Sequence, residues 1–174
     1  DTIVEESTKY SDLVEDDTVT NVTLVAQWKD ITAPTGEISI GTNKWNGFLN
    51  TITFGLFFKD MQAVTISASD NSGEDVAIEY LLSNKALNET ELASATFTSY
   101  TEAFNINPDN KYVVYAKLID TSDNVTYLSS DGIVLDATVP VISGIENGNT
   151  YCKAQIVTIT EKNIESVKVN GTTV

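Results

Sequence analysis

Apolar and polar residues alternate in short stretches along this chain, and turn-forming residues separate the stretches roughly every 8 to 15 residues. β-branched residues and aromatics fill these stretches, and threonine, valine and isoleucine are abundant. This pattern is typical of the many short strands of a β-sandwich or barrel. We expect strands at EISI (37–40), TITFGLFF (51–58), AVTISAS (63–69), AIEYLLS (77–83), AFNI (103–106), KYVVYAKLID (111–120), VTYLSS (125–130), GIVLD (132–136), QIVTIT (155–160) and SVKVN (166–170).

One stretch, NETELASA (88–95), has a helical character instead. Asn88 is a residue type that caps helix N-termini, and Glu91 follows it at the spacing of a capping box. We therefore expect one or two helical turns linking two strands.

Two proline-containing breaks, DITAPTG (30–36) and ATVP (137–140), divide the chain into three segments. Residues 1–30 end in one or two expected strands, and residues 31–137 are long enough for a complete sandwich. Residues 138–174 are too few to bury a two-sheet core by themselves. Either this last segment is truncated or it packs on its neighbour. The expected strands of the first segment contain Val19, Val22, Leu24, Ala26 and Trp28.

Charge and composition narrow the classes of function. The chain has 10 Lys and Arg against 25 Asp and Glu, which gives a formal net charge of -15. So acidic a surface repels nucleic acid and anionic lipid and favours solubility. Hydrophobic residues make up 41% of the chain, enough for a packed core. No apolar run approaches the ~20 residues of a membrane span. No signal peptide is visible, and we expect the chain to be a piece of a longer protein.

Residue types that usually carry chemistry are scarce. The chain contains one cysteine, Cys152, and no histidine. An internal disulfide is therefore impossible, and zinc sites and activated nucleophiles lack their usual residues. We expect Cys152 to be a small buried hydrophobe, and we expect no catalytic residue, cofactor or metal.

The stretch FNINPDNKYVVYAKLIDTSDN (104–124) places six apolar residues at one parity, with Pro108 in a corner. It resembles the E–F corner of immunoglobulin-like and fibronectin type III domains. The resemblance implies that the hydroxyl of Tyr112 bonds to backbone upstream and closes the Greek key. The six residues are Phe104, Ile106, Tyr112, Val114, Ala116 and Leu118.

A longer stretch resembles Ig-like or FN3-like modules of Gram-positive, Clostridia-type cell-wall surface proteins. It carries a D-x-S-G turn at Asp70 to Gly73 and a YAK-x-x-D-x-x-x-N-x-T-Y run from Tyr115 to Tyr127. Where those modules have a tryptophan, this chain has Phe97 and Tyr100. The end of the first segment, TLVAQWKD (23–30), is similar to the tail of Listeria–Bacteroides (InlB B-type) repeats, and residues 138–174 look like the start of a further Ig-like module.

These resemblances imply an all-β chain, with an Ig/FN3-like Greek-key sandwich between partial β modules. They also imply a non-catalytic spacer in an adhesin-like stalk on the bacterial surface, attached to the cell wall through a region outside residues 1–174. Its partners would be neighbouring modules of the same chain. One alternative is a module that binds carbohydrate or host glycoprotein through an aromatic face near Trp45. A third is an accessory domain of a secreted enzyme, with catalytic residues elsewhere in the parent chain.

Acidic residues cluster near expected turns and could coordinate calcium, which takes six to eight oxygen ligands. The bland interpretation, which we favour, is that Asp and Asn side chains bond to nearby backbone and form the turns. No D-x-[DN]-x-[DN]-G loop is present. A carboxylate pair could hydrolyse a glycoside, but with 25 acids some pair will approach by chance. The clustered acids are Asp70, Glu74, Asp75, Asp120, Asp123, Asp131 and Asp136.

Aromatic residues offer a sugar-stacking platform as one interpretation, centred on Trp45 and Phe48 in the expected loop TNKWNGF (42–48). The favoured interpretation is that both cap the open end of the sandwich. The ligand, if there is one, is unknown. The full platform would also include Phe57, Phe58 and Tyr80.

Two kinds of modification are also open. Lys59 and Lys117 lie in or near expected strands, where a lysine can form an isopeptide bond, although alternation points Lys117 outward. Four N-x-[ST] sequons are best interpreted as unmodified turn residues in a bacterial protein. They stand at Asn21, Asn88, Asn124 and Asn170.

Overall fold

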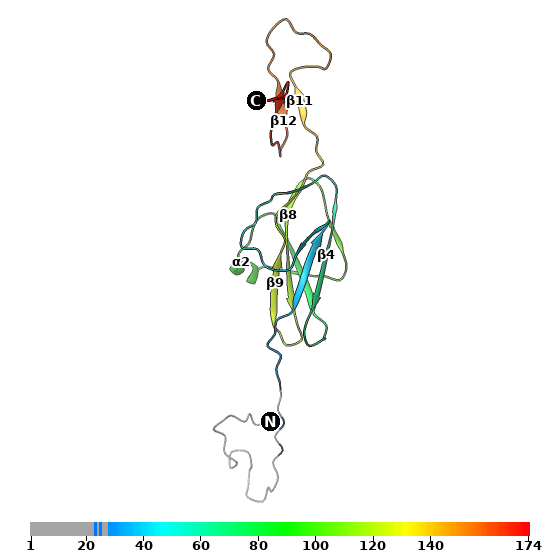
Figure 1. Cartoon of the computed structure of the whole chain (residues 1–174), viewed down its shortest axis with the longest axis vertical. Helices are drawn as coiled ribbons and strands as arrows, with labels where there is room; N and C mark the ends of the chain where they lie inside the picture. Colours follow the sequence, from blue (N-terminus) through cyan, green and yellow to red (C-terminus); the bar gives the residue numbers. More distant parts are fainter. Residues whose placement is uncertain (1–22, 24, 26–27) are drawn as a thin grey trace, which may run out of the picture. The chain divides into compact units, whose positions relative to one another are not determined.

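The computed structural model describes residues 23, 25 and 28–174 (Figure 1). The chain divides into two compact units, Asp1–Asp30 and Ile31–Val174. Most of the first unit, including the expected strand positions Val19, Val22, Leu24 and Ala26, lies outside the described residues. Trp28, which is described, is 93% exposed. The assignment of residues 1–30 to an InlB B-type repeat stays a prediction, as does the boundary at residue 137.

Ile31–Val174 is mostly β-structure, and α2 is the single helix among the described residues. A first sheet has the strand order β2-β1-β4-β7, with every neighbouring pair antiparallel. Its strands are β1 (Thr35–Ile40), β2 (Asn43–Trp45), β4 (Gln62–Ser69) and β7 (Phe104–Ile106).

The second sheet has the order β3-β10-β8-β5-β6, and β9 also pairs with β8. All its pairs are antiparallel except β3 and β10, which run parallel. Figure 1 shows β4 of the first sheet across from β8 and β9 of the second. The strands are β3 (Leu56–Phe58), β5 (Ala77–Ser83), β6 (Thr98–Ser99), β8 (Asn110–Ile119), β9 (Val125–Ser129) and β10 (Ile133–Leu135).

The main core lies between the two sheets, and alternation in the sequence determines which side chains enter it. In β4, Val64 and Ile66 are buried, while Ala63, Thr65 and Ser67, at the opposite parity, are exposed. In β8, Val114, Ala116 and Leu118 are buried in the same core. All six residues expected at one parity from Phe104 to Leu118 contribute to this cluster, so that prediction is confirmed.

A second, smaller core covers the other face of β8. Val113 and Tyr115, at the opposite parity, are fully buried there with Leu92 of α2. The surrounding side chains come from the loop before β3, from the segment around α2 and from the neighbouring strands β5 and β9. This second core explains why β8 is apolar at both parities. They are Phe48, Ile52, Phe54, Leu81, Leu87, Phe97 and Tyr127.

This second core corrects one expected strand. TITFGLFF (51–58) was expected to be a strand along its length, but only Leu56–Phe58 is one. Ile52 and Phe54 instead leave the sheet and pack over β8. The alternation is real, but the residues cover a sheet face and do not extend a sheet.

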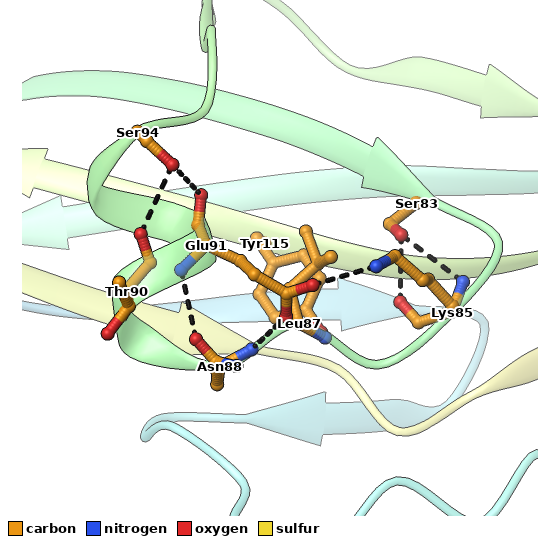
Figure 2. Close-up of polar contacts among 8 residues, drawn as sticks. All are labelled: Ser83, Lys85, Leu87, Asn88, Thr90, Glu91, Ser94 and Tyr115. Atoms are coloured by element: carbon orange, nitrogen blue, oxygen red, sulfur yellow. Dashed lines mark hydrogen bonds and ion pairs between the residues drawn. The ribbon is translucent and has the colours of Figure 1, made fainter.

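The helix α2 (Glu89–Ala93) begins as the sequence predicts, with a complete capping box (Figure 2). The backbone N–H of Glu91 donates to Asn88 Oδ1 at 2.9 Å, and the N–H of Asn88 donates to Glu91 Oε2 at 2.9 Å. Lys85 pairs with the same Glu91 carboxylate at 2.7 Å. The hydrogen bond from Lys85 is the largest reason why the pKa of Glu91 lies below its ordinary value. The helix is therefore fixed in place to bury Leu92.

Residues 138–174, all of which the structure describes, form two small sheets. β11 (Val141–Ser143) pairs with β12 (Thr158–Thr160), and β13 (Lys168–Val169) pairs with β14 (Thr172–Thr173). No residue of this range is buried. Cys152, expected to be a buried hydrophobe, is exposed, so that prediction was wrong. Within the part of the chain that the structure describes, no helix has the length and apolar character needed to cross a membrane.

Candidate functional site

The two places where the chain enters and leaves the sandwich carry the most information about function. The incoming segment Ile31–Pro34 lies against the turn between β8 and β9. Asn124 Nδ2 donates to the carbonyl of Thr32 at 3.3 Å, and Thr126 Oγ1 donates to the carbonyl of Pro34 at 2.5 Å. Pro34 is buried. The chain is therefore held at this end before β1 begins.

Asp120 organises the turn that holds the incoming segment. Its Oδ1 accepts the backbone N–H groups of Ser122 and Asn124, each at 2.8 Å, and its Oδ2 accepts Asn124 Nδ2 at 2.7 Å. Asp123, in the same turn, has a φ of 67°. Burial acts to raise the pKa of Asp120, as does the charge of Asp70, but the bonds from Asn124 and Ser122 hold it below its ordinary value. The charged carboxylate is thus the form that the turn binds.

The chain leaves the sandwich at the other end of β8. Leu135, the last residue of β10, is paired with Asn110, the first residue of β8. The backbone N–H of Asp136 then donates to the carbonyl of Phe58 in β3 at 2.9 Å. The incoming segment binds beyond Ile119, the last residue of β8. Ten strand residues at ~3.3 Å each therefore place about 30 Å between the two points.

Asp131, just before β10, binds the loop that precedes β3. Its carboxylate accepts the N–H and hydroxyl of Thr53, both at 2.6 Å, and the N–H of Gly132 at 2.7 Å. Burial acts to raise the pKa of Asp131, yet these bonds and one from the Phe54 backbone hold it below its ordinary value. Phe54 is in the left-handed region, with a φ of 53°. It lies so close to Gly132 that a Cβ there would come within 2.4 Å of its ring.

Two buried serines replace ladder bonds where β9 and β10 separate. Ser130 Oγ accepts the N–H of Val114 at 2.9 Å and donates to the carbonyl of Asp131 at 2.8 Å. Ser129 Oγ accepts the N–H of Leu49 at 2.8 Å. Both serines are 0% exposed. Their hydroxyls satisfy backbone groups that the interruption would otherwise leave unpaired.

Within the sandwich, the hydroxyl groups that accept backbone N–H groups belong to Tyr100 and Tyr115 and not to Tyr112. Tyr100 Oη accepts the N–H of Ile66 at 3.0 Å, and Tyr115 Oη accepts the N–H of Leu87 at 2.7 Å (Figure 2). Tyr112 packs its ring on the main core but makes no such bond among the described residues. It lines an open groove of about 400 Å³ beside Asn84 and Lys111. The latch expected at Tyr112 is therefore wrong.

The aromatic residues of the suggested sugar platform are divided between cores. Trp45 packs on the main core and Phe48 on the second core, 6.3 Å from Tyr115 between ring centroids. Tyr80 stacks on Phe104 at 4.3 Å. Phe57 remains exposed, at 61%. These positions agree with a packing role, and carbohydrate binding stays the untested alternative.

The acidic clusters are largely occupied by local bonds. Asp70 Oδ1 accepts the N–H and hydroxyl of Ser72 at 2.9 and 2.6 Å, while Glu74 and Asp75 are exposed. Asp136 accepts the N–H of Thr138 at 3.0 Å and its hydroxyl at 2.5 Å. Most of these acids therefore act as turn formers, as the favoured interpretation expects. Calcium binding stays the untested alternative.

The candidate modification sites show ordinary surface contacts. Lys117 lies opposite Glu79 on the neighbouring strand, and their charged groups are 3.4 Å apart. Lys59 is exposed. Of the sequon residues, Asn88 caps α2, Asn124 binds the incoming segment and Asn170 adopts a φ of 51° in the β13–β14 turn. Asn21 lies outside the described residues.

Comparisons with protein-family models, with curated proteins and with solved structures found no match for this chain. The interpretation of the site therefore depends on the geometry of the described residues.

Proposed function

We propose that residues 31–137 form an Ig/FN3-like Greek-key module that acts as a non-catalytic spacer in an adhesin-like stalk of a secreted bacterial surface protein. The observation that carries this proposal is the in-line path of the chain. It enters beside the β8–β9 turn and leaves at the start of β8. A module that the chain traverses from end to end adds its full length, about 30 Å, to a stalk.

The strand pairing supports the Ig/FN3-like class. If β1, β4 and β7 are strands A, B and E, then β5, β8 and the β9–β10 pair are C, F and G, with β6 as C′. These are the two sheets of that class. The parallel strand β3 next to β10 is then an additional A-type strand in the second sheet.

The sheet edges also suit a module that is repeated without self-association. The outermost strands β2, β3 and β7 have three residues each, and β6 has two. Short edges offer little template for pairing with another chain. The net charge of -15 adds repulsion between copies.

A pulling experiment on the full chain tests the proposal. With handles at residues 1 and 174, unfolding of 107 residues (31 to 137) should release about 330 Å of chain in one step. A force applied to the chain after β10 pulls β10 along its parallel partner β3. The hydrogen bonds between these strands are then loaded in shear, so several must break together. Unfolding of this segment in many small steps, or at forces indistinguishable from zero, would contradict the spacer role.

Adjacent proline substitutions provide a matched pair for this experiment. Asp136→Pro removes the N–H that donates to Phe58 in β3 and also the carboxylate that accepts from Thr138. Ala137→Pro removes only a 3.3 Å bond to Asp109 Oδ1. We expect the first to lower the unfolding force and the second to leave it unchanged.

A separate test concerns localisation. The full-length gene product should end in a cell-wall sorting signal, and antibody to this segment should label intact cells.

A further inference from the structure

The segment before β1 is bound to the sandwich more firmly than a linker needs to be. Two of its carbonyl groups, on Thr32 and Pro34, accept side-chain hydrogen bonds from residues 92 positions away in the chain. Thr32 itself is exposed, and Pro34 is buried. Both of these bonds come from side chains and not from a strand ladder.

Each donor is positioned by the fold. Asn124 Nδ2 lies between two acceptors, Asp120 Oδ2 at 2.7 Å and the Thr32 carbonyl at 3.3 Å, so the Asp120 carboxylate aims the amide at the incoming chain. Thr126 belongs to β9, opposite Leu118 of β8 in the ladder. Because the ladder fixes its backbone, its hydroxyl has a fixed direction, and a β-branched side chain has few alternative rotamers.

We propose that Asp120, Asn124 and Thr126 form a linker clamp, a device that keeps Thr32–Pro34 rigid and confines bending of the chain to residues before Thr32. In a stalk, the clamp would fix the direction in which the chain enters the module, and this role rests on the proposed spacer function. The rigidity of the segment itself is independent of that function, and it can be measured without applying force.

The test is the backbone order of the segment in the full chain, from 15N relaxation of the Thr32, Ala33 and Thr35 amides. The unsubstituted protein should show order parameters near 0.85, the value of rigid backbone. The double variant Asn124→Ala, Thr126→Val should lower those of Thr32 and Ala33 below about 0.6. Thr35 should remain ordered, because β1 pairs it with Ser69.

Asn105→Ala with Thr65→Val is the matched control, because both residues are exposed on strands of the first sheet. It should leave the order of Thr32 and Ala33 unchanged. If the double variant keeps Thr32 and Ala33 rigid, the burial of Pro34 suffices and the clamp is refuted. If the double variant does not fold, Thr126→Val alone decides, since valine suits a strand. Unchanged order at Ala33 in that variant likewise refutes the clamp.

Discussion

At the scale of single residues, tyrosine hydroxyl groups tie parts of the sandwich together. Tyr115 is fully buried, and its hydroxyl satisfies the backbone of Leu87 next to α2. Burial raises the pKa of its phenol above the ordinary value. The residue thus joins the central strand to the helical segment, while Tyr112, three positions earlier, ends in an open groove.

Replacing each tyrosine by phenylalanine separates these roles. Tyr115→Phe should destabilise the protein by about 1–3 kcal/mol, because the half-buried N–H of Leu87 loses its acceptor. Tyr112→Phe should change the free energy of unfolding by less than about 0.5 kcal/mol. Urea unfolding measures both. Equal losses in the two variants would show that Tyr112 also latches buried backbone.

Calcium provides a second test at this scale. The Asp120 carboxylate already accepts three hydrogen bonds, and Asp70 Oδ1 accepts two. We therefore expect neither millimolar calcium nor a chelator to shift the melting temperature. A calcium-dependent rise that Asp120→Asn removes, but Asp75→Asn keeps, would assign these acids to a metal site.

At the scale of elements, the loop between β2 and β3 is held by hydrogen bonds to the charged carboxylate of Asp131. The pKa of Asp131 is lowered in the folded protein, so its contribution to stability is present above its unfolded value of about 3.8. That contribution is lost as the pH falls through the folded value. Between pH 6 and pH 3, Asp131→Asn should therefore lose less stability than the unsubstituted protein.

Denaturant midpoints across this pH range measure the effect, and Asp75→Asn is the control. It removes the same charge from an exposed turn residue. Its pH dependence should parallel that of the unsubstituted protein. Identical curves for all three proteins would mean that the bonds to Thr53 and Gly132 contribute no net stability.

The elements also show where sequence reasoning succeeds. Alternation predicts β4, β5 and β8 closely, and the capping box predicts α2, because both signals are local. The stretch 51–58 was misassigned because alternation reports one buried face and not what buries it. The strands β2 and β6 were missed because they are short, with three and two residues, and each depends on its pairing with a neighbouring strand.

The candidate site was less accessible to prediction for the same reason. Nothing local marks Asn124 or Thr126 as ligands of Thr32 and Pro34, since the contact spans 92 positions. Asn124 was noted as a sequon residue and, with Thr126, as part of the run from Tyr115 to Tyr127, but neither was assigned a role in binding the linker. In similar chains, polar residues in a hairpin turn should be examined as possible binding partners of a proline-containing linker elsewhere in the sequence.

At the scale of the whole module, the account requires that the chain enter and leave at opposite ends. The mechanical arguments for a spacer, from the clamp to the sheared β3–β10 pair, depend on this path. The length of β8 sets the separation at about 30 Å.

A distance measurement between spin labels tests this path most directly. Ala33 and Ala137 are exposed and flank the sandwich, so each can be changed to cysteine after Cys152→Ser removes the native thiol. Double electron–electron resonance on the full chain should give one narrow distribution centred at about 30–40 Å, allowing for the labels. A distribution centred below about 20 Å would place both points at one end and contradict the spacer account.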